Sequence, residues 1–155
     1  MSKAPHALSG LLVVALVGGC TPKAEPPSPT AADLVKAPGG AVTDIVYEAL
    51  RVAEKDGRRL VVYVGASWCE PCEVFLGALH AGELPPSLAD LRVLKFDNDV
   101  DDERLSAAGY GGQMIPRFVA PRANGSASAR RFEGSVKGPE AIANIVPRLE
   151  TILAE

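Results

Sequence analysis

The sequence is poor in cysteine and carries no excess of positive charge. Three Cys are too few for a disulfide-dense scaffold or for an iron–sulfur cluster held by four thiolates. A formal net charge of -3 offers no basic field for a phosphate backbone, so we predict no nucleic-acid partner. No catalytic Ser/His/Asp set, Gly-rich phosphate loop, amphipathic membrane helix or internal repeat stands out. The 155 residues, 47% of them hydrophobic, are enough for one compact domain with additional segments.

The N-terminus lacks an apolar run long enough to span a bilayer. Lys3 precedes an apolar run from Ala7 to Val17, and two glycines and Cys20 follow it. The run has about 11 residues, whereas a bilayer requires about 20, and this length is typical of a signal peptide. The stretch from Leu16 to Cys20 resembles a bacterial lipoprotein signal. The resemblance implies a signal peptide at residues 1–19 and lipid on Cys20, which anchors the protein in the cell envelope facing the periplasm, at the inner or the outer membrane.

Residues 20–40 are rich in proline and cannot supply a core. This composition favours extended, polyproline-like conformers, so we predict a tether between Cys20 and a domain at residues 41–155. Leu34 and Val35 leave a short first strand open as an alternative. Because Cys20 is assigned to the lipid, we do not expect it to act as a redox thiol.

Residues 41–155 predict alternating helices and strands. Apolar positions at helical spacing indicate a helix over 42–53 with Thr43 as its N-cap, and continuous β-branched runs indicate buried strands. Further helices are expected over 71–81, over 101–108 with Asp99 as the cap, and after Gly138-Pro139, kinked at Pro147. Strands are expected over 60–65, 91–97, 118–120 and 129–133, the last two joined by a turn at Asn124-Gly125. This order predicts an α/β fold with a mixed sheet of four to five strands flanked by helices on both faces.

The residues that carry chemistry are Trp68-Cys69-Glu70-Pro71-Cys72, directly after a predicted strand and at the start of a helix. Two cysteines three positions apart on a first helical turn can close a disulfide ring. The positive end of the helix dipole favours the thiolate of Cys69, so Cys69 is the expected nucleophile and Cys72 the resolving thiol. Pro71 suits an early helical position, where its missing N–H would have no partner in any case.

Metal chemistry fits these cysteines less well. A zinc site needs four ligands, but beside Cys69 and Cys72 only His80 is available, about 12 Å of helical rise away. We expect His80 to be an exposed residue or a cation at the end of its helix. A c-type haem site would need His at position 73, and the acidic stretch at 97–103 lacks the Gly and the Glu that a calcium loop requires. We therefore predict no metal and no cofactor.

The sequence WCEPC after an apolar strand, with Ile115-Pro116 further on, resembles the thioredoxin family over residues 42–155. The resemblance implies that the Ile115–Pro116 bond is cis and faces the CxxC, where the Ile115 backbone pairs with a substrate strand. It also implies that Trp68, Glu70, Pro71, Ile115 and Pro116 shape the substrate groove. The chain is partly similar to the membrane-tethered ResA-like and TlpA-like reductases, whose extra segment between the CxxC and the cis proline is missing here.

Three positions depart from the thioredoxin pattern and put turnover rate and substrate choice in question. Tyr63 stands six residues before Cys69, where the family has a buried acid. The family's lysine aligns with Val93, although Lys95 lies two residues on and on the same face. Arg117 follows the proline where the family usually has Thr.

Glu70 bears on the direction of exchange. With Glu73 close by, its charge disfavours a second negative charge and is expected to raise the pKa of the neighbouring thiol, which makes the pair a better electron donor. The alternative is a solvated carboxylate that interacts only with the helix dipole.

We therefore predict an enzyme, a monomeric thiol–disulfide oxidoreductase that reduces disulfides of extracytoplasmic proteins. Its electrons would come from a membrane thiol–disulfide carrier. Two alternatives remain: a copper(I)-binding chaperone or docking module that uses both thiolates as soft ligands, and an oxidant that donates disulfides.

Overall fold

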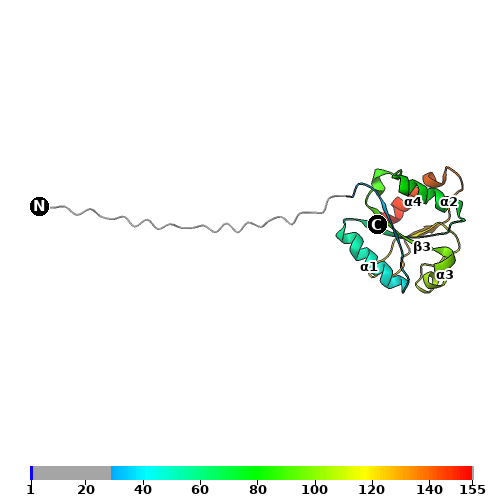
Figure 1. Cartoon of the computed structure of the whole chain (residues 1–155), viewed down its shortest axis with the longest axis horizontal. Helices are drawn as coiled ribbons and strands as arrows, with labels where there is room; N and C mark the ends of the chain where they lie inside the picture. The colour runs from blue at the N-terminus through cyan, green and yellow to red at the C-terminus, as the bar shows by residue number, and fades with distance from the viewer. Residues whose placement is uncertain (2–28, 155) are drawn as a thin grey trace.

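The structure is a computed structural model that describes residue 1 and residues 29–154 (Figure 1). Apart from Met1, the predicted signal peptide lies outside the described residues, as does Cys20. In chain order the elements are β1 (Asp33–Lys36), α1 (Val42–Lys55), β2 (Arg59–Gly65), α2 (Glu70–Ala81), a 3-10 turn (Pro86–Leu88), β3 (Leu91–Asp97), α3 (Asn98–Ala107), β4 (Arg117–Val119), β5 (Arg131–Glu133) and α4 (Ala141–Leu153).

The strands form one mixed sheet in the order β1-β3-β2-β4-β5. β1, β3 and β2 run parallel, and α2 forms part of the crossover that parallel pairing of β2 and β3 requires. β4 runs antiparallel to β2, and β5 antiparallel to β4. The mixed sheet predicted from the sequence is confirmed.

β1 lies within the segment predicted to be a tether. It pairs in parallel with β3, with Leu34 opposite Val93, and Leu34 also packs against a core cluster. An ion pair of 2.7 Å between the guanidinium of Arg92 and the carboxylate of Asp33 holds the strand further. The packed domain therefore extends at least to Asp33 rather than beginning at residue 41. An edge strand of four residues is too short to show a periodic pattern in the sequence.

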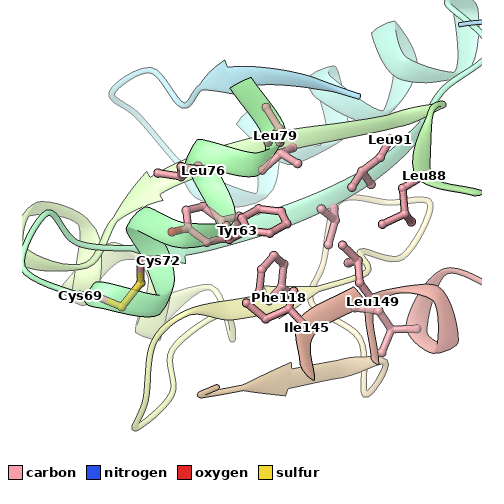
Figure 2. Packing of buried hydrophobic residues seen from close by; sticks show 14 residues of the cluster. Tyr63, Cys69, Cys72, Leu76, Leu79, Leu88, Leu91, Phe118, Ile145 and Leu149 are labelled. Carbon is pink, nitrogen blue, oxygen red and sulfur yellow. A yellow bond between two sulfur atoms is a disulfide. The ribbon is translucent and has the colours of Figure 1, made fainter. Parts of the chain in front are cut away.

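Side chains of β2 alternate between two cores, as in a strand covered on both faces. Val61 and Tyr63 belong to the core that α2 and α4 cover, and Figure 2 shows Tyr63 beneath α2 with Leu149 of α4 further along this core. Val62 and Val64 belong to the second core, which α1 and α3 cover. The CxxC lies at one end of the first core, and α2, which begins there, packs against this core.

Helix boundaries differ locally from the predictions. Thr43 does not cap α1, which begins one residue earlier without a side-chain cap. The carboxylate of Asp97, rather than that of Asp99, caps α3 by accepting the backbone N–H of Asp99 at 2.9 Å. Pro147 lies inside α4, which continues past it. None of the helices in the described part of the chain is both long and apolar enough to cross a membrane.

Candidate active site

Cys69 and Cys72 form a disulfide at the N-terminus of α2. Cys69 is the extended residue that precedes the helix, its carbonyl accepts the backbone N–H of Glu73 at 3.1 Å, and Pro71 lies in the first turn. The Cα atoms of the two cysteines are 5.2 Å apart, and the pairing predicted from the spacing is confirmed. The side chain of Cys69 is 5% exposed and that of Cys72 is fully buried, so an incoming partner meets Cys69 first.

The first turn of α2 presents opposing electrostatic influences to Cys69. Its free backbone N–H groups and the helix dipole favour a thiolate there, whereas the carboxylates of Glu70 and Glu73 oppose one. The Glu70 carboxylate also accepts the backbone N–H of Gly138 at 2.9 Å, which ties the CxxC to the loop before α4. Sequence reasoning missed this contact because the two residues are 68 positions apart.

Trp68 lies at the surface directly before the disulfide. Its side chain is 67% exposed, and its indole N–H donates to a carboxylate oxygen of Asp99 at 2.8 Å. Asp99 lies in the first turn of α3, so this bond joins the CxxC loop to a second helix. Sequence reasoning singled out Asp99 only as a cap, and its role as the partner of Trp68 was missed.

Ile115 and Pro116 lie beside the strand that leads into the CxxC. The peptide bond between them is cis, as the resemblance implied. β4 pairs with β2 so that Arg117 is opposite Val64, and the register continued by one residue places Pro116 beside Gly65. Ile115 packs against the core cluster that contains both cysteines.

Tyr63 fills the position of the family's buried acid with a neutral side chain. It is fully buried, and its ring packs against Phe75 and Phe118 with centroid distances of 5.5 and 5.2 Å. Burial, assisted by the charge of Glu73, raises the pKa of the Tyr63 hydroxyl well above its usual value. The hydroxyl has no hydrogen-bond partner, and it points toward the end of the core where the disulfide lies (Figure 2). A Cβ atom on Gly65 would lie 2.2 Å from this oxygen, so the hydroxyl requires glycine there.

Arg117 points into the protein interior. Its side chain is 1% exposed and lies 3.6 Å from the carboxylate of Glu133 on β5. Burial lowers the pKa of the guanidinium, and the charge of Glu133 acts in the opposite direction. The residue that follows the cis proline is therefore part of an internal ion pair.

His80 is exposed in the last turn of α2, at the opposite end of the helix from Cys69, in agreement with its predicted place. Among the described residues, no group of three or more His, Cys, Asp or Glu side chains lies close enough together to hold a metal ion.

No protein-family model matches the chain, and no curated protein is significantly similar to it in sequence. Solved structures that resemble it include the thioredoxin-like protein Trxlp from Edwardsiella tarda, with 24% identity, 78% of this chain and 98% of that chain covered, and a TM-score of 0.46. A mutant thioredoxin from Halobacterium salinarum is 21% identical, with 83% and 93% covered and a TM-score of 0.48. A thioredoxin from Fasciola hepatica is 24% identical, with 72% and 92% covered and a TM-score of 0.48.

The fold follows from the geometry of the chain itself. Three features together define the fold. Its parallel strands lie in the order β1-β3-β2, its antiparallel β4 follows a cis proline, and its CxxC opens α2 after β2. The described residues form a thioredoxin fold with a CxxC disulfide at a helix N-terminus.

Proposed function

We propose that this protein reduces disulfides of other extracytoplasmic proteins while anchored to a membrane through lipid on Cys20. The supporting observation is the disulfide at the N-terminus of α2, in which Cys69 is 5% exposed and Cys72 is fully buried. Such an asymmetric pair can attack through one sulfur and release its partner through the other.

The reaction proceeds in two thiol–disulfide exchange steps. The thiolate of Cys69 attacks one sulfur of the client disulfide, the client S–S bond breaks, and a mixed disulfide forms while the released client thiolate takes up a proton. The thiolate of Cys72 then attacks the sulfur of Cys69, which releases the second client thiol and closes the Cys69–Cys72 disulfide. The client gains two electrons, and a membrane dithiol carrier restores the reduced pair by the same steps in reverse.

The direction of exchange follows from the charges around the pair. Two carboxylates in the first turn, Glu70 and Glu73, oppose a thiolate on Cys69. A thiolate that is stabilised less favours the oxidised form of the protein and hence transfer of electrons to the client. Trp68, exposed beside the disulfide, supplies apolar surface for the client.

The anchor keeps this chemistry close to the membrane. Because the sheet reaches back to Asp33, the connection after Cys20 has at most residues 21–32 and is shorter than the sequence suggested. At about 3.1 Å per residue, this segment reaches about 40 Å at most. Clients and electron donor therefore have to meet the protein near the membrane surface.

The test uses the full chain in detergent, with Cys72→Ser and Cys69→Ser as a matched pair. Equilibration in thiol buffers followed by alkylation measures the reduction potential, and insulin serves as a protein disulfide. We expect a potential at or below that of ordinary thioredoxins, and client proteins trapped by Cys72→Ser but not by Cys69→Ser. A clearly more oxidising potential would make the protein a disulfide donor. Tight copper(I) binding without insulin reduction would favour the copper-binding alternative.

A further inference from the structure

Three charged side chains of β4 and β5 hold the loop that precedes the cis proline. We call these three side chains the hairpin clamp: Arg117, Arg131 and Glu133. The Arg131 guanidinium donates to the carbonyl of Gly109 at 3.1 Å and to that of Gly111, and Arg117 donates to the carbonyl of Tyr110 at 3.4 Å. Three consecutive carbonyls of the loop over residues 109–114 are thus bound by arginines.

Glu133 binds the other end of the same loop. One of its carboxylate oxygens accepts the backbone N–H groups of Gln113 and Met114 at 2.8 and 2.7 Å. Partial burial of Glu133 acts to raise its pKa, but these two bonds and the charges of Arg117 and Arg131 outweigh burial and hold the pKa below its usual value. The carboxylate is therefore ionised at neutral pH and binds the loop through charge-assisted hydrogen bonds.

The loop is shaped to fit the clamp. A Cβ atom on Gly112 would lie 2.3 Å from Nε of Arg117 and 2.6 Å from the carboxylate of Glu133, so glycine is required where the chain crosses the ion pair. Nε of Arg117 is buried and has no hydrogen-bond partner, which makes the charge of Glu133 its main compensation. The two side chains therefore depend on each other as well as on the loop.

The loop bound by the hairpin clamp leads directly into the active site. Met114, the second residue whose N–H binds Glu133, is 56% exposed and is followed by Ile115 and Pro116 beside the CxxC strand. Because this segment packs beside the cysteines through Ile115 and exposes Met114, it offers main-chain atoms to a client that extends beyond its disulfide.

We propose that Glu133 is a positioning residue for protein substrates, which acts by fixing the backbone of Met114 and Ile115 beside the disulfide. The inference rests on the proposed function. Glu133 touches neither sulfur, so its loss is expected to weaken the binding of a protein client and to leave the redox equilibrium of the cysteine pair unchanged.

The experiment compares the full-length wild type with Glu133→Ala and Glu133→Gln, and with Glu103→Ala as a control at an exposed carboxylate of α3. Dithiothreitol supplies electrons, insulin is the protein substrate, and hydroxyethyl disulfide is the small substrate. For Glu133→Ala we expect KM for insulin to rise about tenfold, equivalent to about 1.4 kcal/mol. Its kcat, its rate with the small disulfide and its reduction potential should each change less than about twofold. Glu133→Gln keeps an oxygen that accepts the two N–H groups, so its KM should rise less.

The outcomes separate the two proposals. Equal losses with insulin and with the small disulfide, or an unchanged KM, would overturn the positioning role while the proposed function stands. A wild type that reduces neither substrate refutes the proposed function and the positioning role with it. If Glu133→Ala melts below the assay temperature, Glu133→Gln alone tests the positioning role. For this variant too we expect a higher KM for insulin and an unchanged reduction potential.

Discussion

Replacing Tyr63 by Phe is expected to stabilise the oxidised protein. The hydroxyl of Tyr63 is buried without a partner, and such a group lowers stability by about 1–3 kcal/mol. Phe keeps the ring contacts to Phe75 and Phe118 and leaves a void of about one oxygen atom, which costs about 0.3 kcal/mol at about 24 cal/mol per Å³. The net gain is about 1 kcal/mol, which corresponds to a rise in Tm of about 4 °C for a domain of this size.

Tyr110→Phe is the matched control. Tyr110 is also fully buried, but its hydroxyl donates to the carbonyl of Gly125 at 2.9 Å. Removing that hydroxyl leaves a buried carbonyl without its partner, so the same chemical change should destabilise the protein by about 1–2 kcal/mol.

Urea unfolding of the oxidised full chain measures both variants. The midpoint should rise for Tyr63→Phe and fall for Tyr110→Phe, with slopes equal to that of the wild type. If Tyr63→Phe lowers the midpoint as much as Tyr110→Phe does, the Tyr63 hydroxyl has a hydrogen-bond partner and the reasoning is refuted.

Three further predictions concern the clamp and the anchor. Gly112→Ala should lower the free energy of unfolding by about 1–3 kcal/mol, because its methyl group meets Arg117; an unchanged urea midpoint would contradict the close packing. The pKa of Glu133 is lower in the folded protein than its usual 4.5. The wild type should therefore be more stable than Glu133→Gln by a constant amount above about pH 4.5, and this difference should shrink as the pH falls. Urea midpoints measured from pH 7 to 3 test this, and a difference that grows toward low pH would refute it. Cys20→Ser should move the protein from the membrane to the soluble fraction of cells, and an unchanged distribution would exclude the lipid anchor.

The buried strands and the redox motif could be predicted because their signals are local. The apolar run of β2 alternates between two cores, and the CxxC follows it directly, so the chain itself places Cys69 at a helix start. β1 was open only as an alternative, because its pairing with β3 depends on a distant strand and on the ion pair between Arg92 and Asp33. Only Leu34 and Val35 marked it in the sequence.

The contacts that surround the site were not predictable, because each joins residues far apart in the chain. Glu70 was expected to act on the thiols or to face solvent; it is exposed, and its bond to the backbone of Gly138 is the contact that the sequence did not indicate. Arg117 was noted only as a departure from a family pattern, and its partner Glu133 carried no signal at all. Side chains that bind distant backbone groups have no periodicity, so a single sequence does not reveal them.

The substitution of Tyr63 for an acid changes where the proton of the resolving thiol can go. With its pKa raised by burial, Tyr63 is protonated at neutral pH and cannot accept a proton from Cys72. In the proposed reaction the proton must therefore leave toward the surface, to solvent or to the client thiolate released by Cys69. The second step then depends on the acidity of the client thiol rather than on a base in the core, which ties the rate of release to the chemistry of the client.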